Sequence, residues 1–236
     1  MAELRCGNIL YVKPKVQKKL LKIYDSLFNH FGPQHWWPGE TPLEICVGAI
    51  LTQNTAWSNV EKAISNLKKE NYLKLRRLKK IKIKELASFI KSSGYFNIKA
   101  ARLKSFIDYF ANHHDGNFNH LFEGKLEDIR NSLLSIKGIG PETADSMLLY
   151  AGELPVFVVD AYTKRIFYRL RLTSKNATYE EVQSFFMNNL PSKTNLYNEY
   201  HALIVMLGKH YCKPKPVCSP CPLKKCPARK SKSLTR

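Results

Sequence analysis

The sequence predicts an all-α protein, and three observations support this class. Apolar residues recur at helical spacing along residues 16–31, 42–67 and 84–110. Runs typical of strands are few; the apolar segment 155–159 is short and follows a Gly-Glu turn, so we interpret it as a loop. Clusters rich in Gly, Pro, Asn or Asp punctuate the chain and divide it into about nine or ten expected helices.

Composition and charge indicate a polyanionic partner. The 236 residues are 44% hydrophobic, enough for a sizeable core, while 38 Lys and Arg face only 19 Asp and Glu. Nucleic acid is the expected partner, and a basic protein without such a partner is the alternative. No apolar run approaches the roughly twenty residues of a membrane span. The first residues lack a secretory signal, which predicts a reducing cytoplasmic location, and the basic tail 228–236 is expected to be disordered.

Residues 133–167 contain a Gly-Ile-Gly-Pro turn between two predicted helices. Gly138 and Gly140 are expected to adopt backbone conformations that side chains disfavour, and Pro141 suits the first turn of the second helix. Amide groups exposed at such a turn bind anions, and Lys137 lies beside it, so the turn is well matched to a DNA phosphate. A plain helix-helix turn is the alternative.

Two acids in this basic chain are candidates for chemistry. Glu142 follows the turn, where it could instead complement the helix dipole for about 0.3–1 kcal/mol. Asp160 precedes the predicted helix 161–170 as a helix cap, a role compatible with stabilising positive charge on a substrate. Trp36, Trp37 and Trp57 lie at turns or helix starts, where they form either a pocket or ordinary packing.

Four cysteines crowd into fifteen residues near the C-terminal end with the spacing C-x5-C-x2-C-x4-C. Four soft thiolates at this spacing indicate either a 4Fe-4S cluster or a zinc ion. We expect Cys6 and Cys46, which stand alone, to be a terminal residue and a core residue. The candidate ligands are Cys212, Cys218, Cys221 and Cys226.

In combination, these motifs resemble the endonuclease III superfamily of helix-hairpin-helix DNA glycosylases. The resemblance covers residues 36–226 and is carried by CVGAILTQNTAW, SSGYFNIKAARL, the hairpin through VVDAYTKRIF and the cysteine cluster. It implies a six-helix barrel domain in residues 32–145. A second domain would combine residues 1–31 with residues 146–236, including the cluster loop and the basic tail. DNA would lie between the two domains with the target nucleotide flipped out.

The resemblance also assigns roles to residues. Endonuclease III has a lysine nucleophile after the hairpin glycine, whereas this chain has Glu142, which cannot form an imine. A Trp-Trp-Pro turn, a Gln-Asn-Thr followed by an aromatic residue, and the hairpin Glu are similar to a bacterial branch that excises 3-methyladenine. By that match the catalytic residues are Asp160 and Glu142, the base pocket is Trp36, Trp37, Pro38 and Trp57, and the DNA-binding residues are Gln53, Asn54, Lys137, Gly138, Gly140 and Thr143.

The predicted function is therefore a base-excision repair glycosylase that hydrolyses the N-glycosidic bond of alkylated purines without cutting the strand. The expected partner is double-stranded DNA with a damaged base, and the expected cofactor is a 4Fe-4S cluster, which we favour over zinc. The protein is expected to be a monomer associated with the nucleoid in the cytoplasm. Alternatives within the enzyme class are a uracil or mismatch glycosylase, or a bifunctional enzyme using Lys137 or Lys164. A non-catalytic DNA-binding module is the rival from another class.

Overall fold

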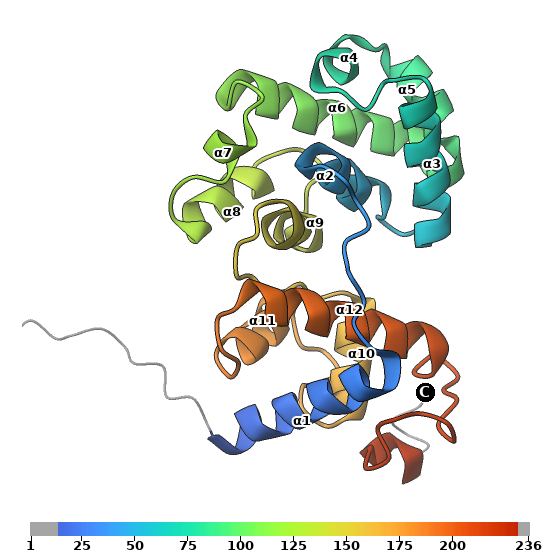
Figure 1. Ribbon diagram of the computed structural model, residues 1–236, viewed down its shortest axis with the longest axis vertical. Coiled ribbons are helices and arrows are strands. Elements are labelled where there is room, and N and C mark those ends of the chain that lie inside the picture. The colour runs from blue at the N-terminus through green and yellow to red at the C-terminus, as the bar shows by residue number, and fades with distance from the viewer. Residues whose placement is uncertain (1–13, 231–236) are drawn as a thin grey trace, which may run out of the picture. The chain divides into compact units, whose positions relative to one another are not determined.

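The computed structural model describes residues 14–230 and contains helices but no strand within that range, which confirms the predicted all-α class (Figure 1). Residues 155–159 form no regular structure, as expected. The α-helices are α1 Pro14–Phe31, α2 Pro42–Leu51, α3 Trp57–Lys69, α4 Leu75–Lys80, α5 Ile83–Phe89, α6 Phe96–His113, α7 Phe118–Leu121, α8 Leu126–Leu134, α9 Pro141–Ser146, α10 Ala161–Arg169, α11 Tyr179–Met187 and α12 Thr194–His210. Shorter elements are the 3-10 turns η1 Lys91–Ser93 and η3 Pro227–Lys230, and a π-helical turn η2 Met147–Ala151.

In the described residues the α-helices are numbered up to α12, whereas the Gly, Pro, Asn and Asp clusters of the sequence predict nine or ten helices. The difference comes from short elements such as α4 with 6 residues and α7 with 4. One turn of helix is too short to display an apolar stripe with a period of 3.6 residues. Short helices of this kind therefore leave no periodic signal in the sequence.

The chain divides into two compact units. One unit takes its described residues from 14–34 and 159–230, and the other is formed by residues 35–158. The chain passes from the first unit to the second between residues 34 and 35, near the expected domain boundary at residue 32. It returns to the first unit between residues 158 and 159, whereas the expected boundary lies between residues 145 and 146. Residue 145 falls inside α9, which continues without a break into η2, so the backbone offers no linker at that point.

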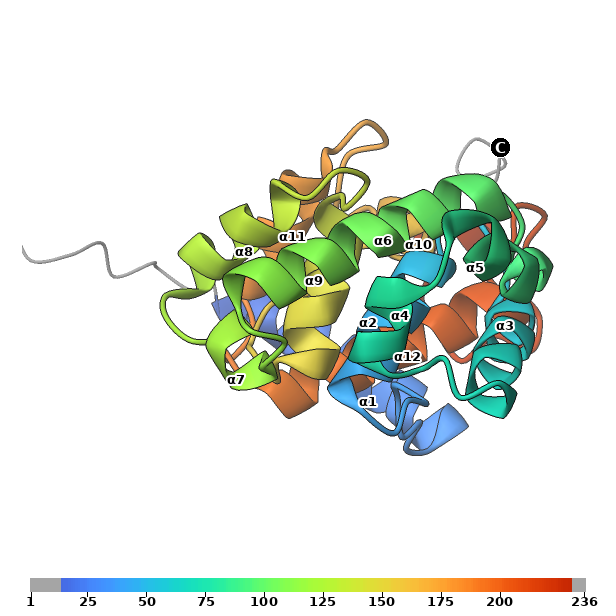
Figure 2. The same ribbon diagram turned by 90° about the horizontal axis from the view of Figure 1, so that it is seen from above.

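The unit of residues 35–158 is built around α2. Thr41 caps this helix by accepting a hydrogen bond from the backbone N–H of Glu44, and Pro42 occupies its first turn. Most of its residues are buried, because α3, α6, α9 and η2 all pack against it. Figure 2 shows α2 together with α6 and α9 in this unit.

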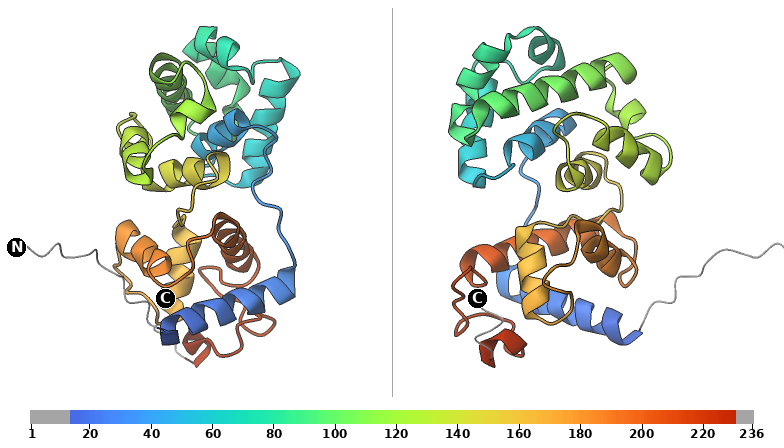
Figure 3. Two further views of the ribbon diagram at one scale, coloured as in Figure 1. Left: turned by 60° about the vertical axis from the view of Figure 1, so that its left-hand side comes forward. Right: turned by 180° about the vertical axis from the view of Figure 1, so that it is seen from behind.

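The other unit packs α12 against both α1 and α10 (Figure 3). Aromatic rings fill its centre: the ring centroid of Phe186 lies 4.6 Å from that of Phe167 and 5.8 Å from that of Tyr200. The Tyr200 hydroxyl donates to the Leu20 carbonyl at 2.8 Å, so α1 and α12 are joined by a buried hydrogen bond as well as by apolar contact.

Further expectations concern two cysteines, the C-terminal tail and membrane crossing. Cys6 lies outside the described residues, whereas Cys46 is buried in α2, as predicted for a core residue. The tail is not irregular throughout: Ala228 to Lys230 belong to η3, and the residues after Lys230 lie outside the described range. No helix between residues 14 and 230 combines the length and apolar character that crossing a bilayer requires.

Candidate functional site

The hairpin joins the end of α8 at Leu134 to the start of α9 at Pro141. Gly138 has φ +92°, a conformation that favours glycine, and a Cβ there would overlap the Arg102 side chain and lie 2.8 Å from its Cδ. The expectation for Gly140 is wrong, because its φ of −100° and ψ of 177° are extended and ordinary for any residue. Nothing lies within 4 Å of a Cβ built on Gly140.

The first turn of α9 presents two of the predicted site residues in different ways, since Glu142 is exposed and Thr143 is buried. Lys137, in the hairpin before α9, is exposed. The hydroxyl of Thr143 accepts a hydrogen bond from Gln53 Nε2 at 2.9 Å. Thr143 therefore contributes to holding the hairpin, and its side chain is directed toward the protein.

Gln53 and Asn54, the two candidates for insertion into the duplex, are also distinguished by their contacts. Besides Thr143, the Gln53 amide donates to the Gly138 carbonyl at 3.1 Å, and its Oε1 accepts from Arg102 Nη1. Asn54 is exposed with φ +53° at the turn after α2. Gln53 is thus engaged by the hairpin, while Asn54 forms the tip.

Three tryptophans and one tyrosine meet beside α2. The ring centroid of Trp37 lies 5.0 Å from those of Trp57 and Tyr150, and that of Trp36 lies 5.7 Å from Trp37 and 6.0 Å from Trp57. The absence of a side chain at Gly48 makes room for this cluster, since a Cβ there would contact both Trp37 and Trp57 at 3.2–3.4 Å.

The polar atoms and the exposure of this aromatic cluster bear on whether it could receive a ligand. The indole Nε1 atoms of Trp36, Trp37 and Trp57 are buried without a hydrogen-bond partner among the described residues, although each tryptophan as a whole is half-buried. Pro38, which follows Trp37, is exposed. Sequence reasoning missed Tyr150, because its orientation depends on the π-helical turn that continues α9.

Asp160 lies in the other unit and caps α10. Its Oδ1 accepts from the Thr163 backbone N–H at 2.7 Å and from the Thr163 hydroxyl at 2.8 Å, which confirms the predicted cap. Its Oδ2 lies 3.8 Å from Nε2 of His201 on α12. Burial lowers the pKa of His201, and the negative charge of Asp160 opposes this shift. His201 was missed because its approach to Asp160 joins two helices that are distant in the sequence, which no local pattern reveals.

Two lysines outside the hairpin, Lys164 and Lys99, differ in their surroundings. Lys164 is half-buried on α10. The described lysine with a markedly lowered pKa is instead Lys99, at about 8, because burial and the Arg102 charge disfavour its ammonium form. Its Nζ donates to the Leu51 carbonyl at 2.8 Å and to the Ser93 carbonyl at 2.6 Å, so it serves to hold the end of α2.

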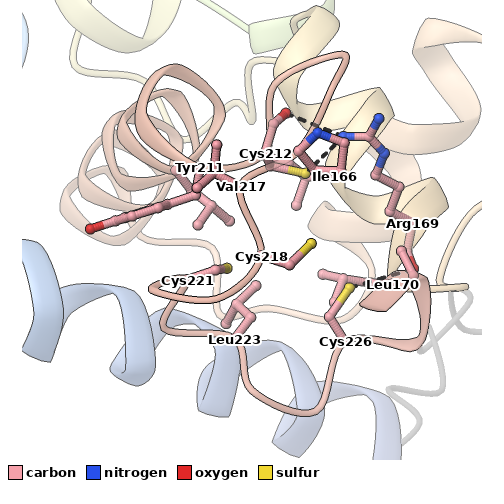
Figure 4. Close-up of a pocket in the computed structure, with 13 residues that line it drawn as sticks. Ile166, Arg169, Leu170, Tyr211, Cys212, Val217, Cys218, Cys221, Leu223 and Cys226 are labelled. Carbon is pink, nitrogen blue, oxygen red and sulfur yellow. Dashed lines mark hydrogen bonds between the residues drawn. The ribbon is translucent and has the colours of Figure 1, made fainter. Parts of the chain in front are cut away.

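The four clustered cysteines line one cavity between α10, α12 and the C-terminal loop, and their sulfur atoms face the same space (Figure 4). Apolar side chains complete the lining, among them Ile166, Leu207 and Leu223. Burial raises the pKa of the Cys221 and Cys226 thiols. In residues 14–230, however, no three His, Cys, Asp or Glu side chains converge closely enough to hold a single metal ion.

Two arginines on α10 fix the start of the cysteine loop. Arg169 is only 4% exposed and donates to the carbonyls of Lys213 at 2.6 Å and Pro214 at 2.8 Å, and its Nη1 lies 3.3 Å from Cys212 Sγ. Arg165 Nε donates to the Cys212 carbonyl at 2.8 Å. The helix that Asp160 caps at one end therefore supports the cysteine loop at the other.

The chain belongs to the HhH-GPD superfamily of base excision DNA repair proteins, whose family pattern matches residues 47–192. It is a DNA glycosylase of base excision repair. A candidate DNA repair glycosylase of Methanocaldococcus jannaschii is 45% identical over 87% of this chain and 94% of its own length. Endonuclease III of Thermotoga maritima is 30% identical over 78% of this chain and 81% of its own.

Solved structures give the same fold. The H. pylori 3-methyladenine DNA glycosylase bound to 1,N6-ethenoadenine is 29% identical with a TM-score of 0.68, covering 84% of this chain and 97% of that one. An endonuclease III trapped covalently on DNA has a TM-score of 0.78 at 21% identity, covering 91% and 97%. The fold is therefore the helix-hairpin-helix glycosylase fold that the motifs predict.

Proposed function

We propose that this glycosylase hydrolyses the bond between an alkylated purine and deoxyribose by a monofunctional mechanism. The observation that carries the proposal is the meeting of Trp36, Trp37, Trp57 and Tyr150 beside α2. A purine alkylated on the ring, such as 3-methyladenine, carries positive charge and is attracted to electron-rich aromatic faces. The 29% identical H. pylori 3-methyladenine glycosylase supports the same substrate class.

In this mechanism the leaving group needs little help. The positive charge already activates the alkylated base, so no general acid is required, and the developing charge lies on the sugar. Asp160 would stabilise that oxocarbenium-like state through its carboxylate or orient the attacking water. Because Oδ1 is engaged by Thr163, Oδ2 is the oxygen assigned to this task.

The proposal of a monofunctional enzyme depends on Glu142, because a carboxylate cannot form the imine on which strand cleavage by β-elimination depends. Lys99 does not supply a substitute nucleophile, since its Nζ is enclosed by the carbonyls of Leu51 and Ser93. An exposed Lys137 or a half-buried Lys164 would have to act if the enzyme cut DNA.

DNA would contact the unit of residues 35–158 through the hairpin and the turn after α2. Backbone amides near Gly140 and the Lys137 ammonium are assigned to phosphate, and either Gln53 or the exposed Asn54 to the space that the flipped nucleotide leaves. Action on chromosomal DNA implies a location in the compartment that holds the DNA, such as the nucleoid in the cytoplasm, and we propose that the protein acts there as a monomer.

The cysteine cavity is proposed to hold a 4Fe-4S cluster through Cys212, Cys218, Cys221 and Cys226. Four thiolates from one loop are the usual ligands of a 4Fe-4S cluster, and a single zinc ion is the alternative. The group would be structural. Purified protein should be brown and contain iron and sulfide; a colourless protein with one zinc would contradict the proposal.

The experiment that tests the function is an excision panel on matched duplexes. The duplexes carry 3-methyladenine or another alkylated purine, uracil, thymine glycol or a G-T mismatch, and each product is analysed with and without alkali. We expect excision of the alkylated purine only, with strand breaks that require alkali. Breaks without alkali, together with borohydride trapping, would show a bifunctional enzyme; excision of uracil or of the mismatched base would reassign the substrate.

A further inference from the structure

We propose that exposed cations around α4 and the start of α5 form a second DNA-binding surface, which holds a duplex other than the one at the hairpin. Residues 71–84 contain seven Lys and Arg and no acid. The inference requires only that the protein works on DNA and is independent of which base it excises. The exposed residues that we call the α4–α5 basic surface are Lys74, Arg76, Lys80, Lys82 and Lys84.

The other two cations of this segment stabilise the protein itself. Arg77 Nη1 donates to the Glu70 carbonyl at 3.1 Å, and its guanidinium carbon lies 5.6 Å from the centroid of the Tyr72 ring. Lys79 Nζ donates to Asn112 Oδ1 at 3.1 Å. These contacts explain two of the seven cations by folding and leave the α4–α5 basic surface to be explained by a partner.

The charges of α4 oppose its own helical structure. Four of its six residues are Lys or Arg, and its first turn contains no acid. Like charges four residues apart, such as Arg76 and Lys80, repel each other along a helix. The helix is stabilised from outside, because Leu78 is fully buried and Lys104 Nζ on α6 donates to the carbonyls of Leu78 at 3.1 Å and Lys79 at 2.6 Å. Such a conflict between local preference and structure is expected where a function requires the charge.

The α4–α5 basic surface and the hairpin lie against different sides of α6. Arg102 of α6 meets the hairpin, where a Cβ on Gly138 would lie 2.8 Å from Arg102 Cδ, whereas Lys104 contacts α4. At 3.6 residues per turn, these two positions point about 200° apart around the helix. Figure 1 shows α4 and α5, which both pack on α6, beyond α6 from α9. A duplex seated on the hairpin therefore meets the opposite side of α6.

Duplex DNA is the polyanion that this surface fits best. Exposed lysines and an arginine bind phosphates without reading bases. Neither aromatic side chain of the neighbouring sequence, Tyr72 or Phe89, is exposed, so the surface lacks the stacking platforms that bind single-stranded nucleic acid. Undamaged duplex surrounds a repair enzyme that searches for lesions. A weak second contact would let the protein pass from one DNA segment to another.

The test measures binding of a second duplex to protein whose hairpin site is occupied. The protein is saturated with a short duplex carrying a stable abasic analogue, and a fluorescent undamaged duplex is then titrated at several salt concentrations. Wild type should bind this second duplex weakly and with a steep salt dependence. A variant combining Arg76→Gln, Lys80→Gln, Lys82→Gln and Lys84→Gln should bind it on the order of tenfold or more weakly. Its salt slope should be smaller by about three to four, because each phosphate contact contributes about 0.9.

Controls separate this surface from bulk charge and from folding. A variant combining Lys15→Gln, Lys18→Gln, Lys19→Gln and Lys22→Gln removes the same charge from exposed positions of α1, and its second-duplex affinity should stay near wild type. Replacing the three lysines of the first variant by arginine should preserve binding, because arginine also contacts phosphate. Single-turnover excision from a short duplex should be unchanged in every variant. Thermal melting verifies that each one is folded.

Three results would overturn the proposal. Wild type that binds no second duplex has no such surface, an unchanged glutamine variant makes the cations a solvated face, and an equal loss in the α1 variant reduces the effect to net charge. Tighter binding of a structured RNA or of polyglutamate than of duplex DNA would also overturn it, by assigning the surface to another partner. None of these results depends on the excised base, so the excision panel tests the proposed function separately.

Discussion

At the scale of single residues, Asp160 combines a structural role with the proposed catalytic one. Asparagine caps helices about as well as aspartate, so Asp160→Asn should keep the Thr163 contacts of α10. It removes the charge opposite the oxocarbenium-like state, and excision should fall by about two or more orders of magnitude. Single-turnover excision and equilibrium binding to damaged duplex measure the two effects separately. Unchanged excision, or a melting temperature that falls sharply, would assign Asp160 to the cap alone.

Lys99 gives a second prediction at this scale, with a sign fixed by its pKa. Burial and Arg102 lower the pKa of Lys99 from the ordinary 10.5 to about 8. Between these values the unfolded chain holds a proton that the folded chain has released, so the free energy of unfolding should rise with pH across this window. Wild type should therefore gain stability relative to Lys99→Met from about pH 8 to 10.5, as urea titrations at each pH can measure. A constant difference across the window would contradict the lowered pKa of Lys99.

The sequence predicts individual site residues unevenly. The Asp160 cap was predictable, because it requires only a short acid before a helical pattern. His201 and Tyr150 were not, since the approach of His201 to Asp160 joins distant segments of the chain and the orientation of Tyr150 depends on a π-helical turn. The resemblance names Gln53 only as a candidate for the space in the duplex, and its hydrogen bonds to Gly138 and Thr143 come from tertiary packing that no local pattern encodes.

At the scale of elements, the two hairpin glycines should respond differently to the same substitution. Gly138→Ala forces a side chain into φ +92° and against Arg102, so it should destabilise the protein by about 1 kcal/mol or more. Gly140→Ala meets extended backbone and open space, and its stability should be unchanged or slightly raised. Urea unfolding of the pair provides the comparison, each variant acting as the control for the other.

The two glycine variants also test whether the hairpin backbone contacts DNA. Because the free protein does not require glycine at position 140, weaker duplex binding by a stable Gly140→Ala would indicate that a phosphate approaches the backbone there. Equal losses of stability in the two variants would contradict the backbone geometry. More broadly, the helices with long apolar stripes were predictable at this scale, whereas α4 and α7 were not, since one or two turns carry no period.

At the scale of the whole molecule, the net charge of +19 and the aromatic cluster should act on different parts of the binding free energy. Charge attracts any duplex and produces a salt dependence that reflects the number of phosphates contacted. The cluster of Trp36, Trp37 and Trp57 offers no charge, so it can contribute only where a base reaches it. Damage recognition should therefore be separable from general DNA affinity.

Trp57→Ala tests this separation. The substitution removes one face of the aromatic cluster, and binding to a duplex with an alkylated purine should weaken by about 1–3 kcal/mol, the usual worth of one base-aromatic stack. Affinity for undamaged duplex, and the slope of that affinity against salt, should stay near wild type because no phosphate contact is lost. Val60→Ala, a buried truncation on the same helix α3, controls for loosened packing. If Trp57→Ala lowers damaged and undamaged binding equally, or matches the Val60 variant in both, Trp57 is a packing residue and the base is recognised elsewhere.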